Sequence, residues 1–129
     1  MKRAVLFSAI AATAALAGTS IGRAQDVENG ANVFRLCRAC HDVGPTAKNK
    51  VGPLLNGIVG RKAGTIEGFN YSEANKKAGA DGWTWTEEKM AEYLLNPRAA
   101  MPGNKMAFAG IKDEQDRKDL IAYLKTFPK

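Results

Sequence analysis

The sequence predicts a small all-α domain, with a few helices and long loops around one bound group. Four segments carry helix caps or apolar residues at helical spacing, near residues 27–40, 72–77, 87–95 and 113–126. No segment alternates apolar and polar residues over a length that favours a strand. Segments 42–69 and 96–110 are rich in Gly, Pro, Asn and Lys. Irregular segments this long are uncommon in a compact domain unless they serve a function, and wrapping a cofactor is one.

The first 24 residues are expected to form a secretory signal peptide. Lys2 and Arg3 precede an uncharged apolar run over residues 4–17. That run is shorter than the roughly 20 residues of a membrane span. Small residues permit cleavage after Ala17 or after Ala24, and we favour Ala24 because a helix is predicted just beyond it. The alternative is an uncleaved N-terminal anchor. The prediction leaves one mature domain, residues 25–129.

Capping residues mark the starts of the helices. Asp26 precedes 27–40, Ser72 precedes a short helix through residue 77, and Thr86 precedes 87–95. Pro97 is expected to end the third helix, and residues 79–82 to form a turn. The acidic residues that open the last helix complement its dipole; they are Asp113, Glu114, Asp116 and Asp119.

Residues 37–41 read Cys-Arg-Ala-Cys-His, the attachment motif of a c-type haem. Positions i, i+3 and i+4 share one helix face, so Cys37 and Cys40 can reach the two vinyl groups of one porphyrin while His41 meets the iron. A disulfide would leave His41 unexplained. A zinc site needs about four ligands, and the chain has two Cys and one His. A thioredoxin-like pair needs a βαβ pattern, which is absent from the sequence. We therefore predict one covalent haem c.

The second axial ligand must come from another residue type, because the chain has no second histidine. Met90 lies on the apolar face of a predicted helix, where core packing is expected. Met101 and Met106 lie in the irregular segment 96–110, and spacing alone does not choose between them. Ligation by His and Met is typical of electron-transfer haems.

Charge is distributed unevenly. The whole chain carries a net charge of +6. Acidic residues are absent from segments 45–64 and 96–112 and then cluster at 113–119. Such asymmetry steers an oppositely charged partner. Basic blocks are short and not interleaved with aromatic residues, which argues against nucleic-acid binding.

Five stretches together resemble the class I cytochrome c family, in the form shared by mitochondrial cytochrome c and related soluble bacterial cytochromes. They are Gly-Pro-Leu-Leu-Asn-Gly at 52–57, Gly-Arg-Lys at 60–62, Gly-Phe-Asn-Tyr-Ser at 68–72 with Asn75, residues 96–111 around Pro-Gly-Asn-Lys-Met, and 120–125. They occur in order and cover nearly all of residues 25–129.

The resemblance implies a small cytochrome c fold with Met106 as the sixth ligand and Met101 as a packing residue. It implies that the Pro53 carbonyl holds His41 and that Tyr93 lies near the Met106 sulfur. It implies that Gly30 and Phe34 pack on Leu120 and Tyr123. It also implies a shell around the haem propionates, made of Arg61, Tyr71, Asn75 and Trp85.

Three departures from the mitochondrial members favour a bacterial periplasmic carrier. Asn104 stands where they usually have Thr, which leaves its hydrogen bonding open. Ala99-Ala100 replace a Lys and an aromatic residue, and about three extra residues lie between Lys77 and Trp85.

The predicted function is one-electron transfer by a soluble monomer that is not an enzyme. Its partners would be redox proteins with acidic docking surfaces: a reductase as donor, and an oxidase, reaction centre or reductase as acceptor. The alternatives, a peroxidase-like haem enzyme or a gas-binding haem sensor, both need an open sixth position. The cations expected to ring the haem edge are Lys48, Lys50, Arg98, Lys105 and Lys112.

Overall fold

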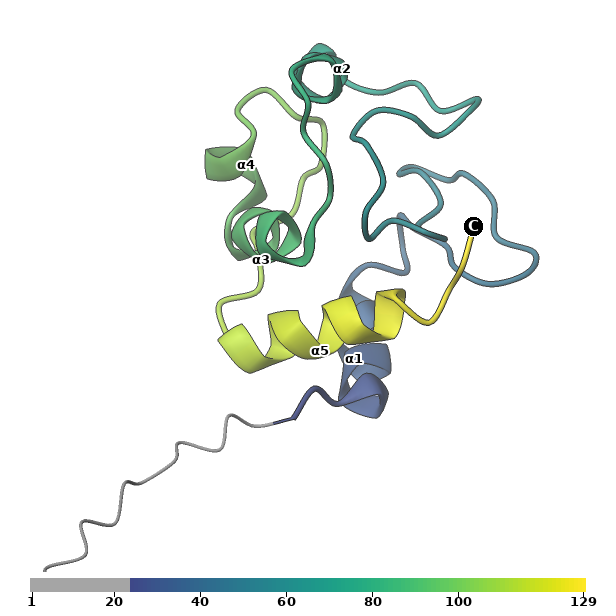
Figure 1. The fold of residues 1–129 in the computed structure, drawn as a ribbon, viewed down its shortest axis with the longest axis vertical. Helices are drawn as coiled ribbons and strands as arrows, with labels where there is room; N and C mark the ends of the chain where they lie inside the picture. The colour runs from purple at the N-terminus through teal and green to yellow at the C-terminus, as the bar shows by residue number, and fades with distance from the viewer. Residues whose placement is uncertain (1–23) are drawn as a thin grey trace, which may run out of the picture.

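The computed structural model describes residues 24–129, so the predicted signal peptide falls outside the described residues except for Ala24. Within them the chain is helical, and its only β-pairing is one isolated antiparallel bridge, Lys62 to Thr84. The all-α prediction is confirmed. No helix in this part of the chain is long and apolar enough to cross a membrane. The elements in order are α1 (Val27–Val33), the 3-10 helix η1 (Phe34–Leu36), α2 (Glu73–Ala80), α3 (Glu87–Leu95), α4 (Pro97–Ala100) and α5 (Glu114–Leu124) (Figure 1).

Helix α5 crosses α1, so the first and the last helix of the described residues pack together (Figure 1). A Cβ atom at Gly30 would overlap the backbone oxygen of Asp119, so the two helix backbones touch at this point. The rings of Phe34 and Tyr123 lie 5.5 Å apart beside the crossing. Leu120 is only 1% exposed. The glycine in the first helix is therefore explained by close helix approach.

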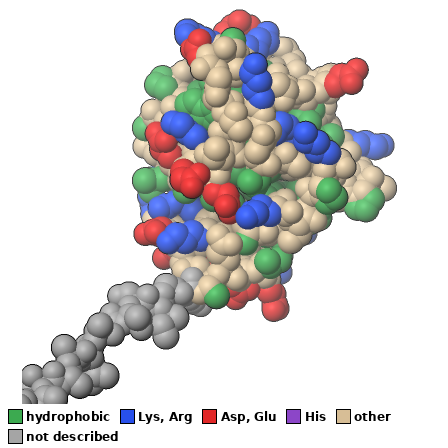
Figure 2. All heavy atoms as spheres, in the orientation of Figure 1, with side chains coloured by type: hydrophobic (Ala, Val, Ile, Leu, Met, Phe, Trp, Pro, Cys, Tyr) green, Lys and Arg blue, Asp and Glu red, His purple; other side chains and the backbone are tan. Residues whose placement is uncertain are grey.

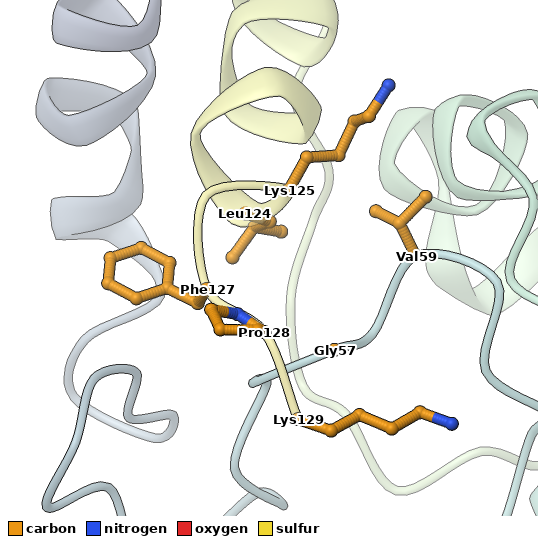
Figure 3. A pocket seen from close by; sticks show the side chains of 7 residues that line it. All are labelled: Gly57, Val59, Leu124, Lys125, Phe127, Pro128 and Lys129. Carbon is orange, nitrogen blue, oxygen red and sulfur yellow. The ribbon is translucent and has the colours of Figure 1, made fainter.

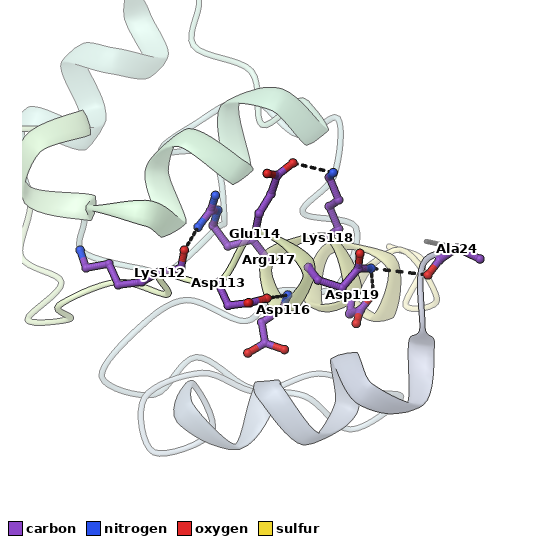
Figure 4. A network of polar contacts seen from close by, with 9 residues as sticks. Ala24, Lys112, Asp113, Glu114, Asp116, Arg117, Lys118 and Asp119 are labelled. Carbon is purple, nitrogen blue, oxygen red and sulfur yellow. Dashed lines mark hydrogen bonds and ion pairs between the residues drawn. The ribbon is translucent and has the colours of Figure 1, made fainter. Parts of the chain in front are cut away.

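Asp119 is buried, although the sequence grouped it with an acidic cluster at the start of α5. It is 1% exposed and accepts hydrogen bonds from the Asp26 backbone N–H, Asn29 Nδ2 and Gln115 Nε2, each at 2.8 Å. Its neighbour Asp116 is only half-buried and is drawn among the polar residues of α5 in Figure 4. Asp119 therefore fastens the start of α1 onto α5.

The predicted caps are present, but three helix boundaries differ from prediction. Side-chain oxygens of Asp26, Ser72, Thr86 and Asp113 each accept a backbone N–H of the helix that follows. The first helix ends as η1 rather than continuing to residue 40. The last one ends at Leu124 rather than residue 126. Helix α2 continues through Gly79 and Ala80, so the turn predicted at 79–82 is wrong there. A side chain at Gly79 would overlap the Ala63 carbonyl, so glycine permits α2 to pack on that loop.

Helix α4 was missed because Pro97 was interpreted only as a helix stop. In the structure Pro97 occupies the first turn, where its missing N–H costs nothing. Asn96 Oδ1 caps the new helix by accepting the Ala99 N–H at 3.2 Å. Pro97 is among the most deeply buried side chains. The segment predicted as irregular therefore begins with a fixed helical corner beside α3 (Figure 1).

Backbone hydrogen bonds connect the long loop to the segment before α3. The Gly60 N–H donates to the Trp85 carbonyl at 2.7 Å, and the Trp85 N–H donates to the Arg61 carbonyl at 2.8 Å. The Ala63 N–H donates to the Trp83 carbonyl at 2.9 Å. This pairing is too short to form a strand, but it places Arg61 next to Trp85.

Candidate functional site

Residues 37–41 form a helical turn that continues η1. The His41 N–H donates to the Cys37 carbonyl at 2.9 Å, and the Cys40 N–H donates to the same oxygen at 3.1 Å. Both thiols are free and half-buried. Burial, with a contribution from Cys40, raises the pKa of Cys37 to about 11. The local backbone thus supplies the one-sided arrangement that the motif requires.

His41 is oriented by the loop that follows it. Its Nδ1 donates to the Pro53 carbonyl across 2.7 Å, which assigns the proton to Nδ1 and leaves Nε2 with a lone pair. The Gly52 N–H donates to the Cys40 carbonyl at 2.8 Å, fixing that loop to the motif. Burial lowers the pKa of His41 against the opposing effect of the Pro53 carbonyl, and Arg61 and Lys50 lower it further. The imidazole is therefore held neutral, the form that binds a metal.

The three methionines among residues 24–129 differ in burial. Met90 and Met101 are 5% and 4% exposed and belong to the core, whereas Met106 is half-buried. The Tyr93 hydroxyl donates to Met106 Sδ at 4.0 Å. Burial raises the pKa of Tyr93 to about 12, so the hydroxyl keeps its proton at neutral pH. The structure thus gives Met106 a polar neighbour.

The predicted propionate shell contains buried groups with unused polar capacity. Arg61 is 8% exposed and donates to backbone carbonyls, at 3.1 Å to Asn56 and 3.4 Å to Leu54. It forms no ion pair with a carboxylate among residues 24–129. Burial lowers the pKa of Arg61, and Tyr71 opposes that shift. The Asn75 Oδ1 atom is buried without a hydrogen-bond partner in the same part of the chain.

Comparison with known proteins decides the family, because the cytochrome c family model matches residues 27–128. The chain belongs to the cytochrome c family. It is 60% identical over 104 residues to cytochrome c2 of Blastochloris viridis, covering 81% of this chain and 80% of that one. It is 61% identical over 98 residues to cytochrome c-550 of Ancylobacter novellus, covering 76% and 92%. The solved structure of cytochrome c2 from Rhodospirillum centenum matches with a TM-score of 0.76 at 46% identity, covering 81% of this chain and 99% of that one.

This cytochrome carries covalent haem c and transfers electrons through it. The residues of the structure fit that group. Cys37 and Cys40 stand on one turn beside a neutral imidazole whose Nε2 has no hydrogen-bond partner among residues 24–129. The haem propionates are anions, and Arg61 is a buried cation that lacks a carboxylate. The unpartnered Asn75 Oδ1 is an acceptor and does not itself match a carboxylate, so the fit rests on Arg61. Buried charge is expensive when unpaired, so Arg61 suits a cofactor that brings carboxylates into the site.

Two residues for which the sequence predicts no role shape this cytochrome's site. A Cβ at Gly52 would lie 2.7 Å from His41 Nδ1, so only glycine fits against the imidazole. The signal available was a glycine directly before the proline whose carbonyl holds the histidine. Asn104, whose hydrogen bonding was left open, donates to the Pro97 and Met101 carbonyls and accepts the Met106 N–H.

Two cavities lie next to the C-terminal residues of the cytochrome. One, of about 310 Å³, opens between the tail and the loop around Gly57, with Leu124, Phe127 and Val59 around it (Figure 3). It contains none of the predicted haem-binding residues. The other, of about 380 Å³, is lined by Leu54, Asn56 and Arg61 among others, and so borders the predicted propionate shell.

Proposed function

We propose that this cytochrome is a periplasmic one-electron carrier and not an enzyme, with His41 and Met106 as the axial ligands of its haem. The carrying observation is that each candidate ligand side chain has a hydrogen-bond partner in the protein, a short one at His41 and a long one at Met106. Pro53 holds His41 Nδ1 at 2.7 Å, and Tyr93 donates to Met106 Sδ at 4.0 Å. A chain that supplies both axial ligands leaves no open position on the iron for a substrate. When bound, haem c supplies the Fe(III)/Fe(II) couple.

The surrounding residues have separate tasks in this proposal. Cys37 and Cys40 anchor the cofactor, and Gly52 leaves space for the imidazole. Tyr93 remains protonated because burial raises its pKa to about 12. Arg61, with Tyr71, Asn75 and Trp85 nearby, compensates the propionate charges in a buried setting.

Substitution of Met106 tests the ligand assignment. Met106→Ala should lower the reduction potential and allow carbon monoxide to bind the reduced protein, because the thioether is lost. Met101→Ala is the matched control: it removes a buried core methionine and should destabilise the fold without opening the iron. The oxidised wild type should show the weak long-wavelength band of sulfur-to-iron charge transfer. An unchanged potential in Met106→Ala would remove Met106 from the iron and would favour the peroxidase-like or gas-sensing alternatives.

Unpaired surface cations support an acidic redox partner. The five cations predicted around the haem edge are exposed, and none forms an ion pair with a carboxylate among the described residues. By contrast, Lys76, Lys77, Lys89, Lys118 and Lys125 each pair with a carboxylate. Figure 2 shows basic and acidic side chains interspersed on one face, so we base the steering argument on missing ion pairs rather than on a segregated patch.

Charge reversal tests this steering. Lys105→Glu should slow the reaction with an acidic redox partner at low ionic strength, and the difference should shrink as salt screens it. Lys118→Glu is the control, because Lys118 is paired with Glu114 on α5. If the rates of wild type and Lys105→Glu are both independent of salt concentration, the steering proposal is wrong.

The periplasmic location rests on the predicted signal peptide. The intact mass of the haem-bearing product from the periplasmic fraction tests it. A product that starts at Gln25 and carries one haem supports the proposal. Retention of residues 1–24 in a membrane fraction would favour the anchor alternative.

A further inference from the structure

The Asn104 side chain connects two parts of the segment that carries Met106. Its Nδ2 donates to the Pro97 carbonyl at 2.9 Å and to the Met101 carbonyl at 2.7 Å. Its Oδ1 accepts the Met106 N–H at 2.8 Å. One half-buried carboxamide thus uses both donor hydrogens and its acceptor on backbone groups. Two carbonyls on one side and an N–H on the other also fix the orientation of the amide.

The Asn104 amide is anchored to residues of the core at Pro97 and Met101. Pro97 opens α4 and is almost fully buried, and Met101, directly after α4, is 4% exposed. Asn96 caps the same helix through the Ala99 N–H. The carbonyls that receive the Asn104 amide therefore belong to a rigid corner. A group attached to that corner has little freedom to move.

The Met106 end has few other restraints. Its neighbours Lys105 and Ala107 are exposed. Among residues 24–129, Asn104 is the one side chain that hydrogen-bonds to the backbone of residues 105–107. Lys105 Nζ reaches the Asn70 carbonyl only at 3.5 Å. The sulfur itself has the long contact to Tyr93. Asn104 therefore supplies the short bond that ties the Met106 backbone to the core.

We propose that Asn104 is a positioning residue that holds Met106 on the haem iron and so limits how often the sixth position opens. This inference rests on the proposed function, in which Met106 is the sixth ligand. A carboxamide is the group the site requires, because two donors and one acceptor are used at once. Aspartate would keep the acceptor and lose both donors. Threonine can supply one donor and one acceptor and should hold Met106 less firmly.

The test uses the holoprotein and measures how fast carbon monoxide binds after reduction, together with the sulfur-to-iron band of the oxidised form. Carbon monoxide enters only when the thioether is off, so its rate reports the open population. Asn104→Leu preserves the approximate side-chain shape and removes all three hydrogen bonds. We expect an about tenfold faster carbon monoxide reaction and a weaker band, because the Met106 backbone loses the hydrogen bond that ties it to the core. Asn104→Thr should fall between Asn104→Leu and wild type.

The matched control is Asn49→Leu. Asn49 also bridges two loop segments, since its Oδ1 accepts the Leu54 N–H at 3.0 Å and its Nδ2 donates to the Glu67 carbonyl at 3.2 Å. It has no contact with the Met106 segment among its hydrogen bonds. Its loss should lower the melting temperature and leave the carbon monoxide rate unchanged. Equal carbon monoxide rates in Asn104→Leu, Asn49→Leu and wild type would reduce Asn104 to a structural residue and overturn the inference.

Failure of the proposed function gives a different result. If wild type binds carbon monoxide as fast as Met106→Ala and lacks the band, Met106 is not a ligand, and the inference falls with that assignment. Should Asn104→Leu not fold, Asn104→Thr decides by the same two measurements. A wild-type rate and band in Asn104→Thr would then overturn the positioning role, and a faster rate with a weaker band would support it.

Discussion

The α1–α5 crossing and the two loop segments that follow Cys40 and Leu95 hold themselves together by different means. At the crossing, helix backbones touch at Gly30, and the side chains between them are almost fully buried. In the loops, key side chains such as Met106 and Leu55 are only half-buried. The crossing is complete in its own contacts. The loops bury their apolar side chains less completely, which fits a region that packs against a cofactor.

Hydrogen bonding shows the same contrast. In the loops, three asparagines use both ends of their side-chain amides to bridge backbone groups: Asn49, Asn56 and Asn104. At the crossing, one buried carboxylate, Asp119, gathers donors from both termini of the domain. Loops without ladders must satisfy backbone groups with side chains or water. The asparagine bridges give the loops a shape, and we expect the haem to supply much of their core.

Blocking haem attachment should have the largest effect, and it should destabilise the loops more than the α1–α5 crossing. We expect Cys37→Ser/Cys40→Ser to lose most of its helical signal in far-UV circular dichroism, because a domain of this size has a single modest core. Amide hydrogen exchange should show the loops losing protection more completely than α1 and α5. Helix content equal to that of the holoprotein would show that the loops do not depend on the cofactor.

Closing the space at Gly30 should break the crossing instead. The side chain of Gly30→Val would overlap the Asp119 carbonyl, where neither helix backbone can move away freely. We expect a loss of about 3 kcal/mol in the free energy of unfolding, measured by urea denaturation. Asn32→Val, at an exposed position of the same helix, should cost well under 1 kcal/mol. Similar costs at both positions would mean that the close approach is not a source of stability.

Asp119→Asn should weaken the same region by a smaller amount. The amide keeps the shape but replaces a charged acceptor of three hydrogen bonds and sets N–H against N–H. We expect a loss of about 2 kcal/mol in the free energy of unfolding, from the same urea measurement. The control, Asp116→Asn, alters a less buried carboxylate that accepts one bond from Asn29. If both substitutions cost the same, burial of Asp119 is not what makes it important.

The sequence predicted the features that depend on local signals. Thr86 and Pro97 defined α3 at both ends, and Asp113 gave the start of α5 within one residue. The contacts of Pro53 with His41 and of Tyr93 with Met106, which the family resemblance implies, are present as hydrogen bonds. Iron ligation by His41 and Met106 and the propionate roles stay predictions.

Features that depend on distant partners could not be predicted from the sequence. Asp119 looked like one acid of a surface cluster, because its donors at Asp26 and Asn29 lie more than 85 residues away along the chain. The pairing of Gly60 and Arg61 with Trp85 leaves no alternating pattern in so few residues. Pro97 carries the same local signal whether it ends one helix or begins the next. Tertiary packing determines the burial of Asp119, the pairing with Trp85 and the helix that Pro97 begins.

Removing a solvent-exposed charge on α5 should have the smallest effect on stability. The comparison with Asp119 therefore separates the contribution of burial from that of charge. Glu114 lies 2.6 Å from Lys118, and the hydrogen bond from Lys118 is the main cause of a lowered Glu114 pKa. A carboxyl whose pKa is lowered by folding contributes stability above its unfolded pKa and loses it as pH falls through the folded value. Glu114→Gln should therefore lower the melting temperature slightly at pH 7, and the difference from wild type should vanish well below pH 4 and shrink in high salt. Scanning calorimetry from pH 3 to 7 measures both trends. A loss as large as that of Asp119→Asn would contradict the view that burial, more than charge, gives the crossing its strength.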